Sequence, residues 1–218
     1  MSYAVSWSGG KDACFGYFKA IKEGCEVSHL LNNISDDYRR VRFHGSEAEM
    51  IQLQAKAMQL PLIQNETAAQ NYARQYKQIV RGMISDGIDG IIFGDIFVRA
   101  NRDFAERICT ELGIKAMFPL WGSNTEELFL EFIDAGFEAI VTGAIPDFDR
   151  RWIGHGLDLD LLNYLKDKGF DSCGENGEYH TLVLSGPLFK QKIEISKCKP
   201  VTISGFQFLD TIEYAFSD

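Results

Sequence analysis

Apolar runs and amphipathic segments alternate along the first two thirds of the chain, and this alternation limits the fold more than any other feature. The apolar runs have the length of buried strands, and the segments between them have the 3.6-residue period of helices. The candidate strands are Tyr3–Trp7, Val27–Asn32, Leu60–Gln64, Gly90–Gly94, Lys115–Leu120 and Glu138–Thr142. The candidate helices are Lys11–Glu23, Glu47–Gln59, Ala69–Ser85, Asn101–Leu112 and Thr125–Ala135. Strands joined by helices of this length predict right-handed crossovers and an α/β fold with a parallel sheet.

The pattern changes beyond Pro146. One short helix is expected at Asp158–Lys168, followed by four short strand-like runs: Thr181–Leu184, Lys192–Ser196, Val201–Phe208 and Thr211–Phe216. Such runs indicate a mixed or antiparallel region, and the absence of a Gly/Ser linker indicates that it packs against the first part. We therefore expect a domain over residues 1–122 and a smaller mixed α+β region over 123–218. Exposed strands near the C-terminus also leave room for a homodimer.

Composition and charge exclude several classes of protein. The chain carries 22 Lys and Arg against 31 Asp and Glu, a net charge of −9, which opposes binding to a nucleic-acid backbone. No apolar stretch is long enough to cross a membrane, and Lys11 and Asp12 interrupt the first apolar run, so we expect neither a membrane span nor a signal peptide. Five scattered cysteines without a C-x-x-C pair argue against zinc and favour reduced thiols in the cytoplasm.

The first candidate strand runs directly into a glycine-rich turn that suits phosphate binding. The turn consists of Ser8, Gly9, Gly10, Lys11 and Asp12. Ligands bind at the carboxyl ends of parallel strands, glycines let the backbone approach a ligand, and the next helix directs free N–H groups to the same place. Lys11 adds a cation, and a carboxylate at Asp12 suits phosphate when Mg²⁺ lies between them. The turn fits neither the Walker A nor the G-x-G-x-x-G pattern, and a plain strand-to-helix turn is the alternative.

This turn and the residue after it, "SGGKDA", resemble the S-G-G-x-D-S pyrophosphate loop of the N-type ATP pyrophosphatases. That superfamily includes GMP synthetase, NAD synthetase, asparagine synthetase and the tRNA thiolases. The resemblance implies a Rossmann-like fold of the HUP type and a reaction that adenylates a substrate and releases pyrophosphate. It also implies that ATP and Mg²⁺ are held by Ser8, Gly9, Gly10, Lys11, Asp12 and Ala13, with Asp12 as metal ligand. Ala13 replaces the usual serine, whose hydroxyl contacts phosphate, and this change weakens the expected ATP binding.

Two further stretches resemble the diphthine–ammonia ligase family. "CGENGEYHTLVLSGPLF", Cys173–Phe189, is similar to that family's G-E-x-G-E-[YF]-x-T signature, and "FPLWG", Phe118–Gly122, resembles its P-L-W segment. "FGDI", Phe93–Ile96, with the "RDFAERICTELGIKAMFPLWG" that follows, looks most like the bacterial branch. The resemblance implies that ATP and ammonia amidate a carboxylate through an acyl-adenylate, giving AMP and diphosphate. The namesake acceptor is diphthine on elongation factor 2 of archaea and eukaryotes, and a bacterial chain would serve another carboxylate, such as a small metabolite.

The resemblance also implies roles for individual residues. Lys11, Asp12 and Glu178 are the expected catalytic residues. The expected substrate-binding residues are Asp95, Glu175, Asn176, Gly177, Glu178 and Tyr179. The two glutamates could bind a cation, orient ammonia or accept a proton, and Glu178 with Tyr179 could hold the trimethylammonium group of diphthine. The alternatives are a turn or helix-cap aspartate at Asp95 and a merely exposed acidic loop.

Other polar residues have no assigned role. A histidine is often structural or solvated, and none of the three candidates is taken as a base: His44, His155 and His180. The loop Pro146–Asp158 is either a second substrate loop, with Arg150 and Arg151 on a carboxylate or phosphate, or a solvated connection.

Two alternative functions stay open. A nucleotide-binding sensor would need no acidic signature, and only Ala13 favours it. A sulfur transferase acting on tRNA would be expected to carry a C-x-x-C pair or a basic surface, which this acidic chain lacks. With no visible glutaminase domain, the ligase is expected to use free ammonia or an external amine.

Overall fold

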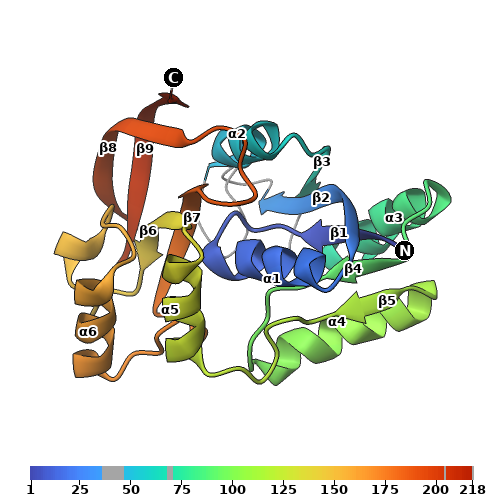
Figure 1. Ribbon diagram of the computed structural model, residues 1–218, viewed down its shortest axis with the longest axis horizontal. Helices are drawn as coiled ribbons and strands as arrows, with labels where there is room; N and C mark the ends of the chain where they lie inside the picture. Colours follow the sequence, from blue (N-terminus) through green and yellow to red (C-terminus); the bar gives the residue numbers. More distant parts are fainter. Residues whose placement is uncertain (36–46, 68–70, 204, 218) are drawn as a thin grey trace.

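The first part of the chain forms a parallel sheet with helices on both faces. The computed structural model describes residues 1–35, 47–67, 71–203 and 205–217. The strands are β1 (Ser2–Ser6), β2 (Glu26–Ser35), β3 (Leu62–Thr67), β4 (Gly90–Ile92) and β5 (Lys115–Met117). They lie in the order β3-β2-β1-β4-β5 and all neighbours are parallel (Figure 1). The helices between them are α1 (Lys11–Lys22), α2 (Ala48–Met58), α3 (Tyr72–Ser85) and α4 (Arg99–Leu112). The predicted parallel α/β fold is confirmed.

Strand alternation decides which helices cover which face of this sheet. Successive side chains of a strand point to opposite faces. Ala4 and Leu31 pack in one buried cluster with residues of α3 and α4, whereas their neighbours Val5 and Leu30 pack with residues of α1 and α2. Because β1 has β2 on one side and β4 on the other, the chain changes direction across the sheet at β1. The loop after β1 therefore lies at the position where open α/β sheets bind ligands.

The second part forms an antiparallel sheet. Its strands are β6 (Glu138–Ala144), β7 (Tyr179–Ser185), β8 (Ile193–Ile203) and β9 (Phe206–Phe216), in the order β7-β6-β9-β8. Helices α5 (Thr125–Asp134) and α6 (Leu159–Lys168) accompany it, together with a 3₁₀ turn η2 (Arg150–Trp152). Phe132 from α5 and Leu182 from β7 belong to the same buried cluster as α1 and α2, so the two parts share a core.

Two details differ from the predicted strand pattern. The strand at Glu138–Ala144, which follows a helix as the parallel strands do, pairs with β7 and β9 instead of with β5. The predicted strand Val201–Phe208 is wrong because Gly205 adopts a left-handed conformation, φ +87°, and the chain reverses there. The result is a hairpin of two 11-residue strands with Ile203 opposite Phe206.

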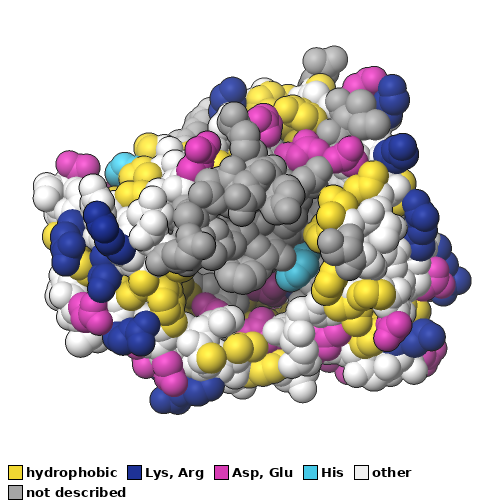
Figure 2. Space-filling model, turned by 180° about the vertical axis from the view of Figure 1, so that it is seen from behind, with side chains coloured by type: hydrophobic (Ala, Val, Ile, Leu, Met, Phe, Trp, Pro, Cys, Tyr) yellow, Lys and Arg dark blue, Asp and Glu magenta, His cyan; other side chains and the backbone are white. Residues whose placement is uncertain are grey.

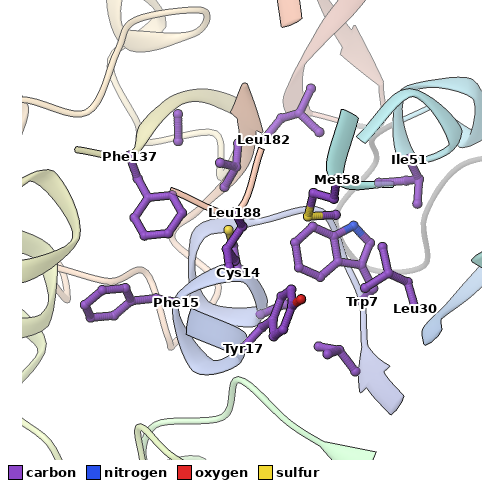
Figure 3. Packing of buried hydrophobic residues seen from close by; sticks show 14 of the residues in the cluster. Trp7, Cys14, Phe15, Tyr17, Leu30, Ile51, Met58, Phe137, Leu182 and Leu188 are labelled. Carbon is purple, nitrogen blue, oxygen red and sulfur yellow. The ribbon is translucent and has the colours of Figure 1, made fainter. Parts of the chain in front are cut away.

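A buried glutamine joins the two parts beside the glycine-rich turn. The side chain of Gln54 is inaccessible to solvent, and its Oε1 accepts a hydrogen bond from Trp7 Nε1 at 3.0 Å. Its Nε2 donates to the carbonyl oxygens of Gly9 at 2.9 Å and Val183 at 2.7 Å. Figure 3 shows Trp7 and Leu182 pointing into the core that surrounds this link. A single amide therefore connects the end of β1, the glycine turn and β7.

We expect Gln54→Leu to destabilise the protein strongly. Leucine keeps most of the volume but leaves Trp7 Nε1 and the Val183 carbonyl buried without this partner. At about 1–3 kcal/mol for each stranded group, the free energy of unfolding should fall by about 2–5 kcal/mol in urea titrations. Gln52→Leu, on the exposed face of the same helix, should change it by less than about 0.5 kcal/mol. Equal losses in the two variants would contradict the role given to Gln54.

Candidate active site

A cavity of about 750 Å³ lies at the carboxyl ends of β1, β2 and β4, where the second part of the chain closes over the parallel sheet. The turn after β1 and the loop before β7 contribute to the same cavity, although about 160 residues separate them. The residues with an expected role that line it are Ser8, Lys11, Asp12, Ala13, Asp95, Glu175, Asn176, Gly177 and Tyr179. Gly9, Gly10 and Glu178, which were also expected at the site, are not among its lining residues.

Gly9 and Gly10 shape the turn through their own packing. Gly9 has φ +83°, and a Cβ there would lie 2.4 Å from Ile51 Cδ1, so only glycine fits. Gly10 precedes α1, which begins without a side-chain cap. The N–H of Lys11 donates to Thr181 Oγ1 at 3.0 Å. One N–H of the expected phosphate cradle is therefore used by β7, which lies next to the start of α1 (Figure 1).

Gly94, between β4 and Asp95, lets the first turn of α1 approach closely. A Cβ on Gly94 would lie 2.6 Å from the backbone nitrogen of Ala13. The loop after β4 is thereby pressed against the phosphate turn, and Asp95 is brought to the same cavity.

The ammonium group of Lys11 is buried between the two parts of the chain. Its residue is 3% exposed, and Nζ donates to Asp12 Oδ2 at 2.9 Å and to the carbonyl oxygen of Cys173. The ring of Tyr179 lies 5.0 Å from Nζ. Burial lowers the pKa of Lys11, but the Asp12 carboxylate, with smaller contributions from Tyr179 and Cys173, raises it above the usual value. Lys11 therefore stays charged.

Three carboxylates line the cavity close to one another. Burial raises the pKa of Asp12, of Asp95 and of Glu175, and the charge of Asp12 raises the pKa of the other two further. Glu175 Oε1 accepts from the backbone N–H groups of Ile96 at 2.8 Å and Phe97 at 3.3 Å, which fixes its carboxylate. Among the described residues that line the cavity, Lys11 is the one cation beside these acids, so this side of it favours cations. Figure 2 shows acidic side chains, in magenta, above and below the centre of the face that it displays.

Glu178 lies within its own loop and not among the residues that line the cavity. Its carboxylate is buried within its own loop, where Oε1 accepts from the N–H of Asp171 at 3.0 Å and Oε2 from the N–H of Asn176 at 3.1 Å. Asn176 Nδ2 donates to Oε1 as well, at 3.1 Å. The carboxylate thus holds the loop from within, because a buried charge needs donors around it.

Tyr179 is also held from within. Its hydroxyl donates to the carbonyl oxygen of Ser172 at 2.7 Å, and its ring is buried. The ammonium group of Lys11 lies over this ring. Gly174 has φ +69°, and a Cβ there would meet the Tyr179 ring at 2.7 Å, so the loop packs directly on this tyrosine.

His180 lies at the cavity, whereas His155 and the loop Pro146–Asp158 lie outside it. His180 lines the cavity, and burial together with the charge of Lys11 lowers its pKa to about 4. His155 pairs with Asp158 at 2.8 Å outside the cavity. The loop Pro146–Asp158, which is described in full, contributes no residue to the cavity. His44 lies outside the described residues.

Sequence reasoning missed three kinds of residue. Gln54 and Thr181 bind the phosphate turn, and Asp171 fixes the loop before β7. An apolar wall at the other end of the cavity was also missed and consists of Leu31, Tyr72, Tyr76, Phe93, Val98 and Phe104. The i, i+4 spacing of Tyr72 and Tyr76 could have indicated a shared helix face, whereas nothing local marks Gln54.

A metal ion is the remaining expectation at this site. Among the described residues, no group of three or more His, Cys, Asp or Glu side chains could hold a metal ion. Asp12 lines the cavity with its side chain 27% exposed, and the other carboxylates stand near it. This arrangement fits an ion that takes most of its ligands from a bound phosphate, as Mg²⁺ commonly does with nucleotides.

No helix in the described part of the chain is long and apolar enough to cross a membrane.

Comparison with known proteins gives consistent matches along the chain. A family model for the diphthamide synthase N-terminal domain matches residues 1–116, and one for the diphthamide synthase C-terminal domain matches 124–211. The diphthine–ammonia ligase of Rattus norvegicus is 30% identical over 239 aligned residues, covering 95% of this chain and 88% of the rat protein. The Homo sapiens protein of the same name is 28% identical with the same coverage.

Among the solved structures that align with the chain, one covers most of its length. It is titled as a predicted subunit of tRNA methyltransferase from Methanocaldococcus jannaschii, and it covers 86% of this chain and 98% of its own at 15% identity and a TM-score of 0.48. A likeness at this level carries no conclusion about function.

We expect His180 to make stability fall on acidification. The unfolded chain takes up a proton near pH 6.5, whereas the folded chain binds it only near pH 4, so the contribution of neutral His180 is lost as the pH falls through this window. Between pH 7 and pH 5 the free energy of unfolding should therefore drop by about 1–2 kcal/mol more in the wild type than in His180→Gln. Urea titrations at the two pH values measure this difference. Parallel behaviour of the two proteins would contradict the burial of a neutral imidazole.

Proposed function

The chain belongs to the diphthamide synthase family, and we propose that it is an ATP-dependent ligase that adenylates a carboxylate and transfers ammonia to it. The observation that carries this proposal is the convergence of two distant motifs on one cavity. The turn Ser8–Ala13 resembles a pyrophosphate loop, and the loop Cys173–Thr181 resembles the signature of a diphthine–ammonia ligase. A nucleotide-binding sensor would not need the signature loop Cys173–Thr181 beside its phosphate turn.

The two parts of the chain divide the work in this proposal. Residues 1–122 bind ATP, with the triphosphate at the phosphate turn and the base against the apolar wall formed by residues such as Leu31, Phe93 and Phe104. Residues 123–218 bind the carboxylate acceptor beside Asn176, Gly177 and Tyr179. The carboxylate oxygen attacks the α-phosphorus, the bond to the bridging oxygen of the β-phosphate breaks, and diphosphate leaves.

The phosphate turn stabilises the charge that develops on the leaving diphosphate. The start of α1 directs its positive end toward the cavity, and Lys11 adds a fixed ammonium group that needs no rearrangement. Asp12 is the residue that would hold Mg²⁺, with Asp95 or Glu175 near it. Such an ion would offset the negative charge of the phosphates, which otherwise repel these acids.

Ammonia attacks the acyl carbon of the adenylate in the second step. Ammonium is a cation, so the carboxylates of Asp95 and Glu175 favour its binding. It gives up one proton before the attack and a second as the amide forms, while the bond between the acyl carbon and AMP breaks. The raised pKa values of Asp95 and Glu175 make their carboxylates better proton acceptors than exposed acids.

Three further features belong to this proposal. The acceptor is either diphthine on elongation factor 2 or, in a bacterial chain, a smaller carboxylate. A homodimer would form along β8, the outer strand of the second sheet. We place the protein in the cytoplasm, where a reducing environment suits its five free cysteines.

We expect Asp12→Asn to abolish ligation without unfolding the protein. The amide can still accept the hydrogen bond of Lys11, but it loses the charge that an ion needs. With Mg-ATP, ammonium and a panel of acceptors that includes diphthine-bearing elongation factor 2 and a deproteinised cell extract, formation of AMP and diphosphate should drop at least about 100-fold. Asp86→Asn, an exposed aspartate after α3, should keep the wild-type rate. A folded Asp12→Asn protein with wild-type activity would contradict the role given to Asp12.

We expect Ala13→Ser to strengthen ATP binding. Ala13 is buried in the first turn of α1 and lines the cavity, so a hydroxyl there adds one donor to the phosphate site. One hydrogen bond to a charged group should lower the dissociation constant for Mg-ATP about fivefold in calorimetry. Ala105→Ser, which adds a hydroxyl to α4 at the apolar end, should give no gain. Unchanged affinity in Ala13→Ser would place the triphosphate elsewhere.

A further inference from the structure

Asp171 anchors the loop that reaches from the second part of the chain to the phosphate turn. Its Oδ1 accepts hydrogen bonds from the backbone N–H groups of Cys173 at 3.0 Å and Glu175 at 2.9 Å. Its Oδ2 accepts from Thr125 Oγ1, in the first residue of α5, at 2.7 Å. One carboxylate therefore fixes two peptide groups of the loop and ties them to the start of a helix.

Asp171 fixes the N–H groups of Cys173 and Glu175, and both of these residues contact the first part of the chain. The carbonyl oxygen of Cys173 accepts from the ammonium group of Lys11, and the carboxylate of Glu175 accepts from the N–H groups of Ile96 and Phe97. Gly174 stands between them with φ +69°, and its packing on Tyr179 leaves no room for a Cβ. The loop is thus held in one conformation, and the residues on both sides of Gly174 contact the first part of the chain.

Lys11 depends on this shape because its ammonium group is buried. A buried charge needs a complete set of partners, and the partners of Nζ are Asp12, the Cys173 carbonyl and the Tyr179 ring. Asp12 is part of the same turn, so the Cys173 carbonyl is the partner that sets the direction of the side chain from outside. The peptide group that carries this carbonyl lies between the Cys173 and Glu175 N–H groups that the Asp171 carboxylate holds. Its own N–H, on Gly174, donates to the backbone carbonyl of Asp171 at 2.9 Å.

We propose that Asp171 is a positioning residue for the ATP site, which acts by holding the Cys173 carbonyl where it directs Lys11 toward Asp12 and the triphosphate. Asp171 does not itself line the cavity, so its effect on the nucleotide passes through Lys11. This inference rests on the proposed function, because it takes ATP as the ligand of the phosphate turn.

The alternative is a structural role in which Asp171 only stabilises its loop. A double-mutant cycle separates the two, because a positioning effect needs Lys11 and a structural effect does not. Mg-ATP binding is measured by calorimetry for the wild type, Asp171→Ala, Lys11→Met and the double variant, each checked for folding by circular dichroism. Asp171→Ala should weaken binding about tenfold in the wild-type background and less than about twofold in the Lys11→Met background.

Three further variants sharpen the test. Asp171→Asn should bind Mg-ATP almost as the wild type does, because its amide oxygen can still accept from both N–H groups. Asp167→Ala, an exposed aspartate on α6, is the matched control and should have no effect. If Asp171→Ala fails to fold, Thr125→Val removes only one of the three hydrogen bonds and should weaken binding about threefold, again only when Lys11 is present.

The outcomes are distinct. Equal losses in the two backgrounds, or an Asp171→Asn protein as weak as Asp171→Ala, would overturn the positioning role while leaving the ligase proposal intact. A folded wild-type protein that does not bind Mg-ATP would overturn the proposed function and, with it, this inference.

Discussion

The site depends on one contact, the packing of β7 against the turn that follows β1. The carbonyl oxygen of Gly9 accepts from Gln54 Nε2 and from the N–H of Val183, and the N–H of Lys11 donates to Thr181. All these groups are buried, so each needs its partner, and the second sheet can dock in only one register. The cavity, the burial of Lys11 and the position of the acidic loop all follow from this register.

Charge balance explains how an acidic cavity can accept ATP. Within the described lining of the cavity, Asp12, Asp95 and Glu175 face one lysine, whose ammonium is already paired with Asp12. A triphosphate entering alone would meet net repulsion, whereas a triphosphate with a divalent cation brings its own compensation. The carboxylates left over then attract ammonium, which is the other substrate. The same excess of acid that opposes a nucleic-acid backbone therefore suits the proposed reaction, which combines a metal-bound nucleotide with a small cation.

Periodicity in the sequence was sufficient for the helices and for the parallel sheet, because those patterns are local. It could not assign Glu138–Ala144 to the second sheet, since a strand has the same alternation in either sheet and its partner is chosen by the tertiary fold. The motifs brought the right segments to one cavity, but they could not show that Glu178 turns inward. That direction depends on the N–H groups of Asp171 and Asn176, which are donors only in the folded loop. Gln54 was invisible for the same reason, because its three partners are distant in sequence.

The loop before β7 is the structural link between the two half-reactions. On one side it contacts Lys11 and the backbone of Ile96, and on the other it lines the cavity beside the proposed acceptor. An acceptor that shifts this loop must change the partners of a buried ammonium group, and a buried charge tolerates little change in its partners. The Cys173 carbonyl therefore connects the proposed acceptor side of the cavity to its phosphate side.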